Sequence, residues 1–160
     1  MTIITATHLA NDLIAFAARV KTASRKMRKL ADRIRSTSAI LSEIGILIGL
    51  TTDSYVASKL QAKPGFKHLK DARDECDRLF ESMTQRISDA NKVVFTDASE
   101  KTDRKNSLTE EERDKLRLME IDLDEMEADI EYQKSNLQLR LTIFTFEVQT
   151  AEARNRKQAR

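Results

Sequence analysis

Residues 116–151 read LRLMEIDLDEMEADIEYQKSNLQLRLTIFTFEVQTA, and this stretch decides the fold. Its apolar residues recur at steps of three or four, with Gln133 filling one position between Ile130 and Leu137. Such steps keep a stripe on one face of a helix, whereas a half-buried strand needs a period of two. The stripe consists of Leu116, Met119, Leu123, Met126, Ile130, Leu137, Leu141, Phe144, Val148 and Ala151.

The helix that carries this stripe is expected to run from residue 108 to residue 154. Ser107 and Glu110 can form a capping box at its start, and no Gly or Pro follows them. At about 1.5 Å per residue this helix is roughly 70 Å long. An apolar stripe of that length needs neighbours along all of it, so the rest of the chain is expected to supply them.

Three further helices are predicted, over residues 3–20, 24–50 and 64–94, with a helical turn near residues 55–60. Each long segment has its own apolar stripe, and Pro64 stands at a helix start, where its missing N–H costs nothing. The sequence therefore predicts an all-α, antiparallel helical bundle of four main helices. Residues 1–155 form this single domain. The basic end of the chain is expected to fray from residue 153, and residues 156–160 are interpreted as a truncated linker.

The stretch from Ala39 to Leu50 is apolar nearly all round. A helix end of this kind is normally packed between several others, so it is predicted to be the most deeply buried part of the chain. An alternative stays open, in which this stretch and the N-terminal helix are released and insert into a bilayer or into another copy of the bundle.

Composition weighs against an enzyme. Only 3 Gly and 1 Pro occur in 160 residues, and 34% of the residues are charged, which is typical of a helical bundle. His8 and His68 lie far apart, and neither a Glu-x-x-His pair nor a phosphate-binding loop is present. We therefore expect no enzymatic activity, metal or cofactor. Cys76 lies on an apolar stripe, which favours a small buried group over a nucleophile.

The same features set expectations for location. The lone cysteine indicates a reducing compartment, and neither a secretory signal nor an apolar run of membrane-spanning length is found. A cytoplasmic protein is expected, and peripheral attachment to a membrane stays open as an alternative.

Charge is unevenly distributed although the net charge is only +2. Residues 1–50 carry 8 Lys/Arg and 3 Asp/Glu, whereas residues 108–160 carry 9 and 13. The favoured interpretation is that a basic helix lies beside an acidic one and their charges compensate. The functional alternative is a surface for anionic lipid headgroups or a partner. Nucleic acid is not expected, because no aromatic residue accompanies the charges. This basic cluster consists of Lys21, Arg25, Lys26, Arg28, Lys29, Arg33 and Arg35.

Two segments resemble a known family. Residues 27–44, MRKLADRIRSTSAILSEI, are similar to its helix that begins Lys/Arg-Leu-Ala and continues with spaced aliphatic residues. Residues 126–141, MEADIEYQKSNLQLRL, are similar to its leucine-rich segment, with matches at Lys134, Ser135, Leu137, Leu139 and Leu141. Over residues 3–148 the chain thus resembles the N-terminal domain of fungal STAND (NLR-like) proteins, also described as HeLo-like domains.

This resemblance implies a bundle placed before a nucleotide-binding oligomerisation module, with a role in signalling, non-self recognition and programmed cell death and with no catalytic residues. We therefore expect a non-enzymatic protein-protein interaction domain that binds a partner protein or itself, as a homodimer or higher oligomer. No small-molecule substrate is expected. The long last helix supports self-association, because it overhangs a third helix of roughly 46 Å and needs a neighbour there. The alternative is a membrane-docking or membrane-perturbing domain of the HeLo type.

Overall fold

The computed structural model describes residues 2–19, 24–52, 57–96 and 110–159. These residues are almost entirely helical, and no strand occurs among them. The predicted all-α bundle of four main helices is therefore confirmed. The helices are α1 (Thr2–Arg19), α2 (Ser24–Thr52), the short α3 (Ala57–Gln61), α4 (Pro64–Thr96) and α5 (Glu110–Gln158).

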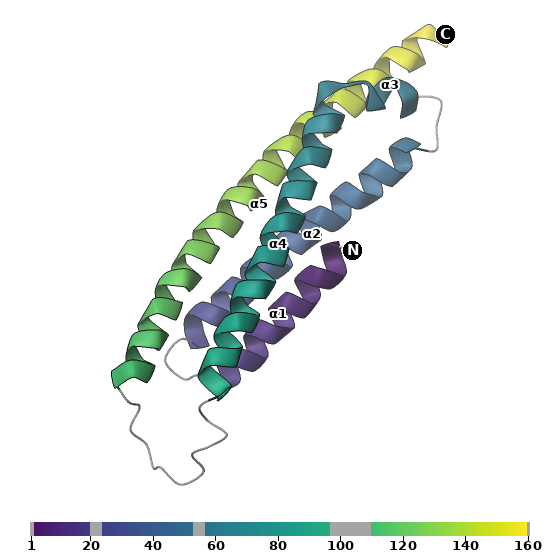
Figure 1. Cartoon of the computed structure of the whole chain (residues 1–160). Coiled ribbons are helices and arrows are strands. Elements are labelled where there is room, and N and C mark those ends of the chain that lie inside the picture. The colour runs from purple at the N-terminus through teal and green to yellow at the C-terminus, as the bar shows by residue number, and fades with distance from the viewer. Residues whose placement is uncertain (1, 20–23, 53–56, 97–109, 160) are drawn as a thin grey trace.

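The four long helices form two antiparallel hairpins, α1 with α2 and α4 with α5 (Figure 1). The hairpins meet through contacts of α2 with α5 and of α1 with α4. The helices of each of these two pairs run parallel. Hydrogen bonds from Lys26 to Asp124 and from Arg33 to Glu131 both span 98 residues, and only parallel helices keep such a constant offset. The short α3 lies between α2 and α4 and contacts both.

The core lies where the predicted apolar stripes of the four long helices meet. Thr37 is the one polar member of the α2 stripe, and its buried hydroxyl donates a hydrogen bond to the carbonyl of Arg33 at 2.9 Å. That bond satisfies the hydroxyl without a partner from another helix. The largest fully buried side chains are Phe80, Phe144, Leu9, Leu13, Met27, Leu30, Ile34, Ile44, Leu69, Met83, Ile130 and Leu137.

The prediction that Ala39–Leu50 is the most deeply buried stretch is wrong. Ile46 is 63% exposed, and Leu47 and Ile48 are only half-buried. Among the described side chains of this stretch, Leu41 and Ile44 are fully buried, while Ile40, Leu47 and Ile48 are partly buried against the core.

The exposure of this helix end follows from the shortness of α1. Arg35 of α2 donates a hydrogen bond to Asn11 of α1 at 3.4 Å, which fixes the antiparallel register of the two helices. Counting outward from that contact places Thr2, where α1 begins, level with Ile44. The last turns of α2, residues 45–52, therefore extend past α1 and lack its cover (Figure 1).

The last helix is longer than predicted. With 49 residues, α5 is about 74 Å long. It bends gradually, and its C-terminal end projects past α3 (Figure 1). The expected fraying from residue 153 is wrong, because the helix continues to Gln158 and the N–H of Ala159 still bonds to the carbonyl of Asn155 at 3.1 Å. The predicted capping box at Ser107 lies outside the described residues.

Candidate interaction surface

Three members of the basic cluster form ion pairs with acidic residues of α5. The favoured interpretation, compensating charges on neighbouring helices, is confirmed for these three residues. The hydrogen bond to Asp124 also raises the pKa of the Lys26 ammonium group. The pairs are Lys26–Asp124 at 2.8 Å, Lys29–Glu127 at 2.6 Å and Arg33–Glu131.

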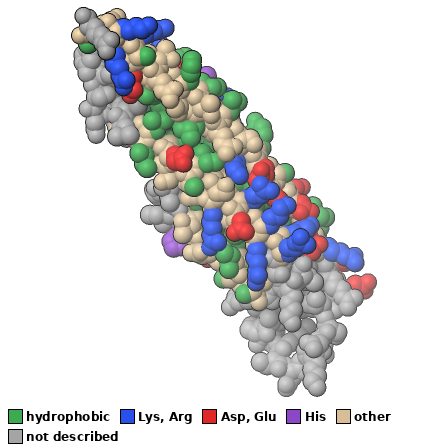
Figure 2. Space-filling view, turned by 180° about the vertical axis from the view of Figure 1, so that it is seen from behind, with side chains coloured by type: hydrophobic (Ala, Val, Ile, Leu, Met, Phe, Trp, Pro, Cys, Tyr) green, Lys and Arg blue, Asp and Glu red, His purple; other side chains and the backbone are tan. Residues whose placement is uncertain are grey.

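The other members of the cluster are dispersed. Arg35 lies 3.8 Å from Asp32 on its own helix. Arg25 and Arg28 are exposed and form no ion pair within the described parts of the chain, and Lys21 lies outside them. On the face shown in Figure 2, basic and acidic side chains are intermingled. The structure thus does not gather the cluster into one free basic surface, and its binding to lipid stays a prediction.

A second apolar stripe, which was not predicted from the sequence, runs along α5. Successive turns of about 100° per residue place it on the side of the helix opposite the core stripe. We call it the outer stripe. Its side chains are between 41% and 69% exposed, and they are Leu118, Ile121, Tyr132, Leu139, Ile143 and Phe146.

The spacing within the outer stripe is that of a coiled-coil seam. Tyr132, Leu139 and Phe146 are seven residues apart, and Ile143 divides the last interval into steps of four and three. This heptad pattern places apolar side chains toward a second helix. The heptad spacing can be read in the sequence, but apolar residues on opposite faces of a helix reduce its overall amphipathic pattern. The core stripe alone was enough to predict a helix, so the second stripe was not predicted.

Within the part of the chain that is described, no group of His, Cys, Asp or Glu could hold a metal ion. Cys76 is buried, and the desolvation raises the pKa of its thiol to about 12, with the charge of Asp77 adding to the effect. A thiol with this pKa is protonated at neutral pH and is a poor nucleophile.

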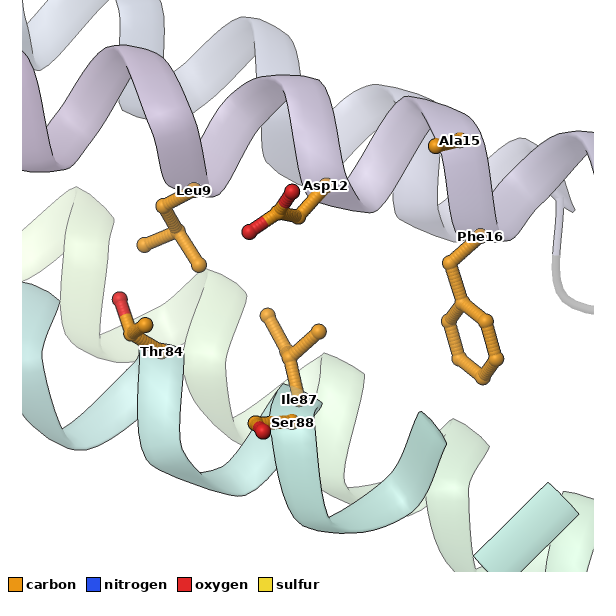
Figure 3. A pocket seen from close by; sticks show the side chains of 7 residues that line it. All are labelled: Leu9, Asp12, Ala15, Phe16, Thr84, Ile87 and Ser88. Carbon is orange, nitrogen blue, oxygen red and sulfur yellow. The ribbon is translucent and has the colours of Figure 1, made fainter. Parts of the chain in front are cut away.

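A pocket of about 260 Å³ lies between α1 and α4 (Figure 3). Asp12 is its one charged group, so no second acid or base stands ready for proton transfer. Its volume also lies below the roughly 300–1,000 Å³ of typical small-molecule sites. The residues that line it are Leu9, Asp12, Ala15, Phe16, Thr84, Ile87 and Ser88.

Comparison of the chain with models of protein families, with curated proteins and with solved structures finds no match. The resemblance to the STAND N-terminal domain therefore stays a prediction from the sequence. Among the described helices, none combines the length and apolar character needed to cross a membrane.

Proposed function

We propose that the chain is a non-enzymatic interaction domain that binds another protein chain through the outer stripe of α5. The observation that carries this proposal is the stripe itself, six large apolar side chains exposed along one helix. Single exposed apolar residues are ordinary on protein surfaces, whereas a contiguous apolar patch marks an interaction site. Burying one such side chain fully is worth about 1.5–3 kcal/mol, so covering several of them supplies ample free energy for association.

The resemblance to the N-terminal domain of fungal STAND proteins supports a signalling role for this association. In that role the bundle associates with a partner protein or with itself in the cytoplasm and transmits non-self recognition toward regulated cell death. The arrangement suits such a task, because the core stripe holds α5 in the bundle while the outer stripe is presented along the same rigid helix.

A membrane-docking function has weaker support. It requires the basic cluster to face lipid headgroups, but Lys26, Lys29 and Arg33 already pair with carboxylates of α5. Arg25 and Arg28 remain exposed. These two cations form no ion pair with other described residues, and together they gain roughly 2 kcal/mol at an anionic surface, at about 1 kcal/mol each, which is marginal for a single binding signal.

Site-specific photo-crosslinking in cells that express the chain tests the proposed function. A photoreactive phenylalanine analogue replaces Phe146 in one variant, and the same analogue replaces Glu81, an exposed residue of α4, in the matched control. We expect discrete protein adducts from position 146 and none from position 81. Absence of adducts from position 146, or the same adducts from both positions, would contradict the proposal.

A further inference from the structure

We infer that the outer stripe binds a second copy of this chain, with the two α5 helices side by side and antiparallel. The inference rests on the proposed function, because it names the occupant of the proposed binding surface. Three features of the exposed side chains on α5 carry it: an uncharged middle, an acidic segment before it and a basic segment after it.

The exposed side chains in the middle of α5 are all uncharged, and the nearby Arg140 and Glu147 are partly buried. Leu139, Ile143 and Phe146 supply the apolar contacts there, and polar but neutral side chains surround them. Two such segments can lose their water without burying an unpaired charge, which is the costly step in forming an interface. The exposed residues from 135 to 150 are Ser135, Gln138, Leu139, Thr142, Ile143, Phe146 and Gln149.

The segments on either side carry opposite charge. Between residues 120 and 132 every exposed charged residue is acidic. Between residues 151 and 159 the exposed charged residues are three cations and one acid, Glu152. The exposed face of α5 therefore changes from acidic to neutral to basic along its length. The acids are Asp122, Asp124, Glu125 and Asp129, and the cations are Arg154, Arg156 and Lys157. Asp124 already pairs with Lys26, and Asp122 and Glu125 pair with Arg86 of α4, so Asp129 is the acid of this segment that has no ion pair among the described residues.

This order of charges selects one orientation. In a parallel pair each segment would face its own copy, so acid would meet acid and base would meet base. In an antiparallel pair centred between Thr142 and Ile143, each acidic segment faces the partner's basic segment. Asp129 and Arg154 lie on the same side of α5, because the 25 positions between them bring the helix back to within about 20° of the same direction. They stand about 20 Å and about 17 Å from that centre along the helix axis. The structure shows no ion pair for either within the described residues.

A second copy fits the surface better than a lipid bilayer does. Anionic headgroups would be repelled by the acidic segment that holds Ile121 and precedes Tyr132. A second α5 instead presents the matching heptad seam, with opposite charge beyond it, and a two-fold pair closes on itself. Such a pair covers Tyr132, Leu139, Ile143 and Phe146 of the outer stripe, whereas Leu118 and Ile121 lie beyond the end of the partner helix.

Distances between spin labels test the orientation. Single cysteines replace Thr142 or Ala153, both exposed, in a Cys76→Ala background. If that background does not fold, the native chain serves, because Cys76 is buried. We expect a dimer with a short interchain distance at position 142 and roughly 32 Å along the axis at position 153, which corresponds to 1.5 Å per residue over both arms. Short distances at both positions, or no interchain distance at about 0.1 mM protein, would overturn the inference.

Charge exchange provides a second test. Asp129→Lys and Arg154→Glu should each raise the dimer Kd by about three- to tenfold, because each homodimer then contains two like-charge contacts. An equimolar mixture of the two variants should restore the wild-type Kd, since both contacts become attractive in the mixed dimer. Glu75→Lys on α4 is the matched control and should leave the Kd unchanged. A mixture that dissociates as readily as either variant alone would overturn the antiparallel arrangement.

The two proposals can fail separately. If the chain is monomeric at about 0.1 mM and position 146 nevertheless crosslinks to a different protein, the second copy is excluded and the interaction domain stands. If neither a dimer nor any adduct forms, both proposals are overturned.

Discussion

The Nζ atom of Lys26 lies 2.8 Å from Oδ2 of Asp124, although the two residues are 98 positions apart in the chain. The same separation joins Arg33 to Glu131, and Lys29 pairs with Glu127 between them. These contacts follow one side of the junction between α2 and α5. They place the most basic segment of the chain against its most acidic one. Several charged side chains that could have bound an external partner are therefore paired within the bundle.

The first prediction concerns the strength of this junction. A double-mutant cycle on Arg33→Ala and Glu131→Ala should give a coupling free energy of about 0.5–1 kcal/mol in urea denaturation, because both side chains are partly exposed. The coupling should shrink when salt is raised, since the Debye length falls from about 10 Å to about 3 Å between 0.1 M and 1 M. Arg28→Ala, at an exposed residue that forms no ion pair with any other described residue, should change the unfolding free energy by less than about 0.5 kcal/mol. A coupling near zero at low salt would contradict the pairing.

Two phenylalanines of α5 separate the core stripe from the outer stripe. Phe144 is fully buried with its ring centroid 5.7 Å from that of Phe66, whereas Phe146 is 69% exposed. Phe144→Ala should therefore lower the unfolding free energy by about 3–5 kcal/mol. Phe146→Ala should lower it by less than about 0.5 kcal/mol when measured on the dilute monomer. Similar losses for both variants would mean that the two faces of α5 are not distinct.

Alkaline pH should weaken the fold through Cys76. Its thiol has a pKa raised from 9.0 to about 12 by burial, so above pH 9 the unfolded chain loses this proton while the folded chain keeps it. The unfolding free energy should then fall by up to about 1.4 kcal/mol per pH unit between pH 9 and 12. Lys26 has a pKa raised above 10.5, and its contribution is lost only above that value, so pH 9 to 10.5 isolates the thiol. In urea titrations of Cys76→Ala over this range, the unfolding free energy should no longer fall with pH as it does in the wild type. A fall of the same size in this variant would contradict the attribution to the Cys76 thiol.

The start of α4 depends on a close contact with α5. A Cβ atom placed on Gly65 would lie 2.8 Å from Cδ of Glu147, so the missing side chain lets this carboxylate approach the positive end of α4. In the wild type, Gly65→Ala should displace the Glu147 side chain, and the cost of this displacement should offset the roughly 1 kcal/mol that alanine gains over glycine in helix propensity. In a Glu147→Ala background the same change should stabilise the protein. Thermal unfolding of the four chains tests this, and equal effects in both backgrounds would contradict it.

Vesicle experiments address the remaining cations. Because three members of the basic cluster are paired, we expect no dye leakage from phosphatidylserine vesicles at about 0.15 M salt, where the Debye length is near 8 Å. Any binding at low salt should disappear in Arg25→Ala/Arg28→Ala. Leakage at 0.15 M salt would show that the ion pairs open at a membrane and would move the membrane function ahead of the interaction domain.

Helix positions and core residues could be predicted from the sequence because each stripe repeats at helical spacing over many turns. The compensation of charge between α2 and α5 could be predicted as well, since the two segments differ so clearly in sign. The burial of Ala39–Leu50 could not, because apolar character does not reveal that α1 starts level with Ile44. The composition of a helix end shows which residues could be buried, but whether they are buried depends on how far the neighbouring helices extend.

The outer stripe was missed for a different reason. Leu139 and Leu141 were both assigned to one matching segment, yet the first is 58% exposed and the second is half-buried against the core. Side chains two positions apart in a helix point in directions that differ by about 200°, so these two leucines lie on opposite faces of α5. The two faces are distinguished by the apolar residues that remain once the core stripe has been assigned. Tyr132, Leu139 and Phe146 are among these residues.

The most direct test of association through the outer stripe is sedimentation equilibrium of the wild-type chain beside a Leu139→Glu/Phe146→Glu variant, with Ser36→Glu/Ser82→Glu on α2 and α4 as the matched control. All four positions are exposed, so all three chains should fold and show the same helical circular dichroism. We expect the wild type and the control to reach twice the monomer mass of 18.3 kDa as concentration rises, while the Leu139→Glu/Phe146→Glu variant stays at the monomer mass. A dimer that survives in that variant, or a wild type that remains monomeric, would contradict self-association through this face of α5.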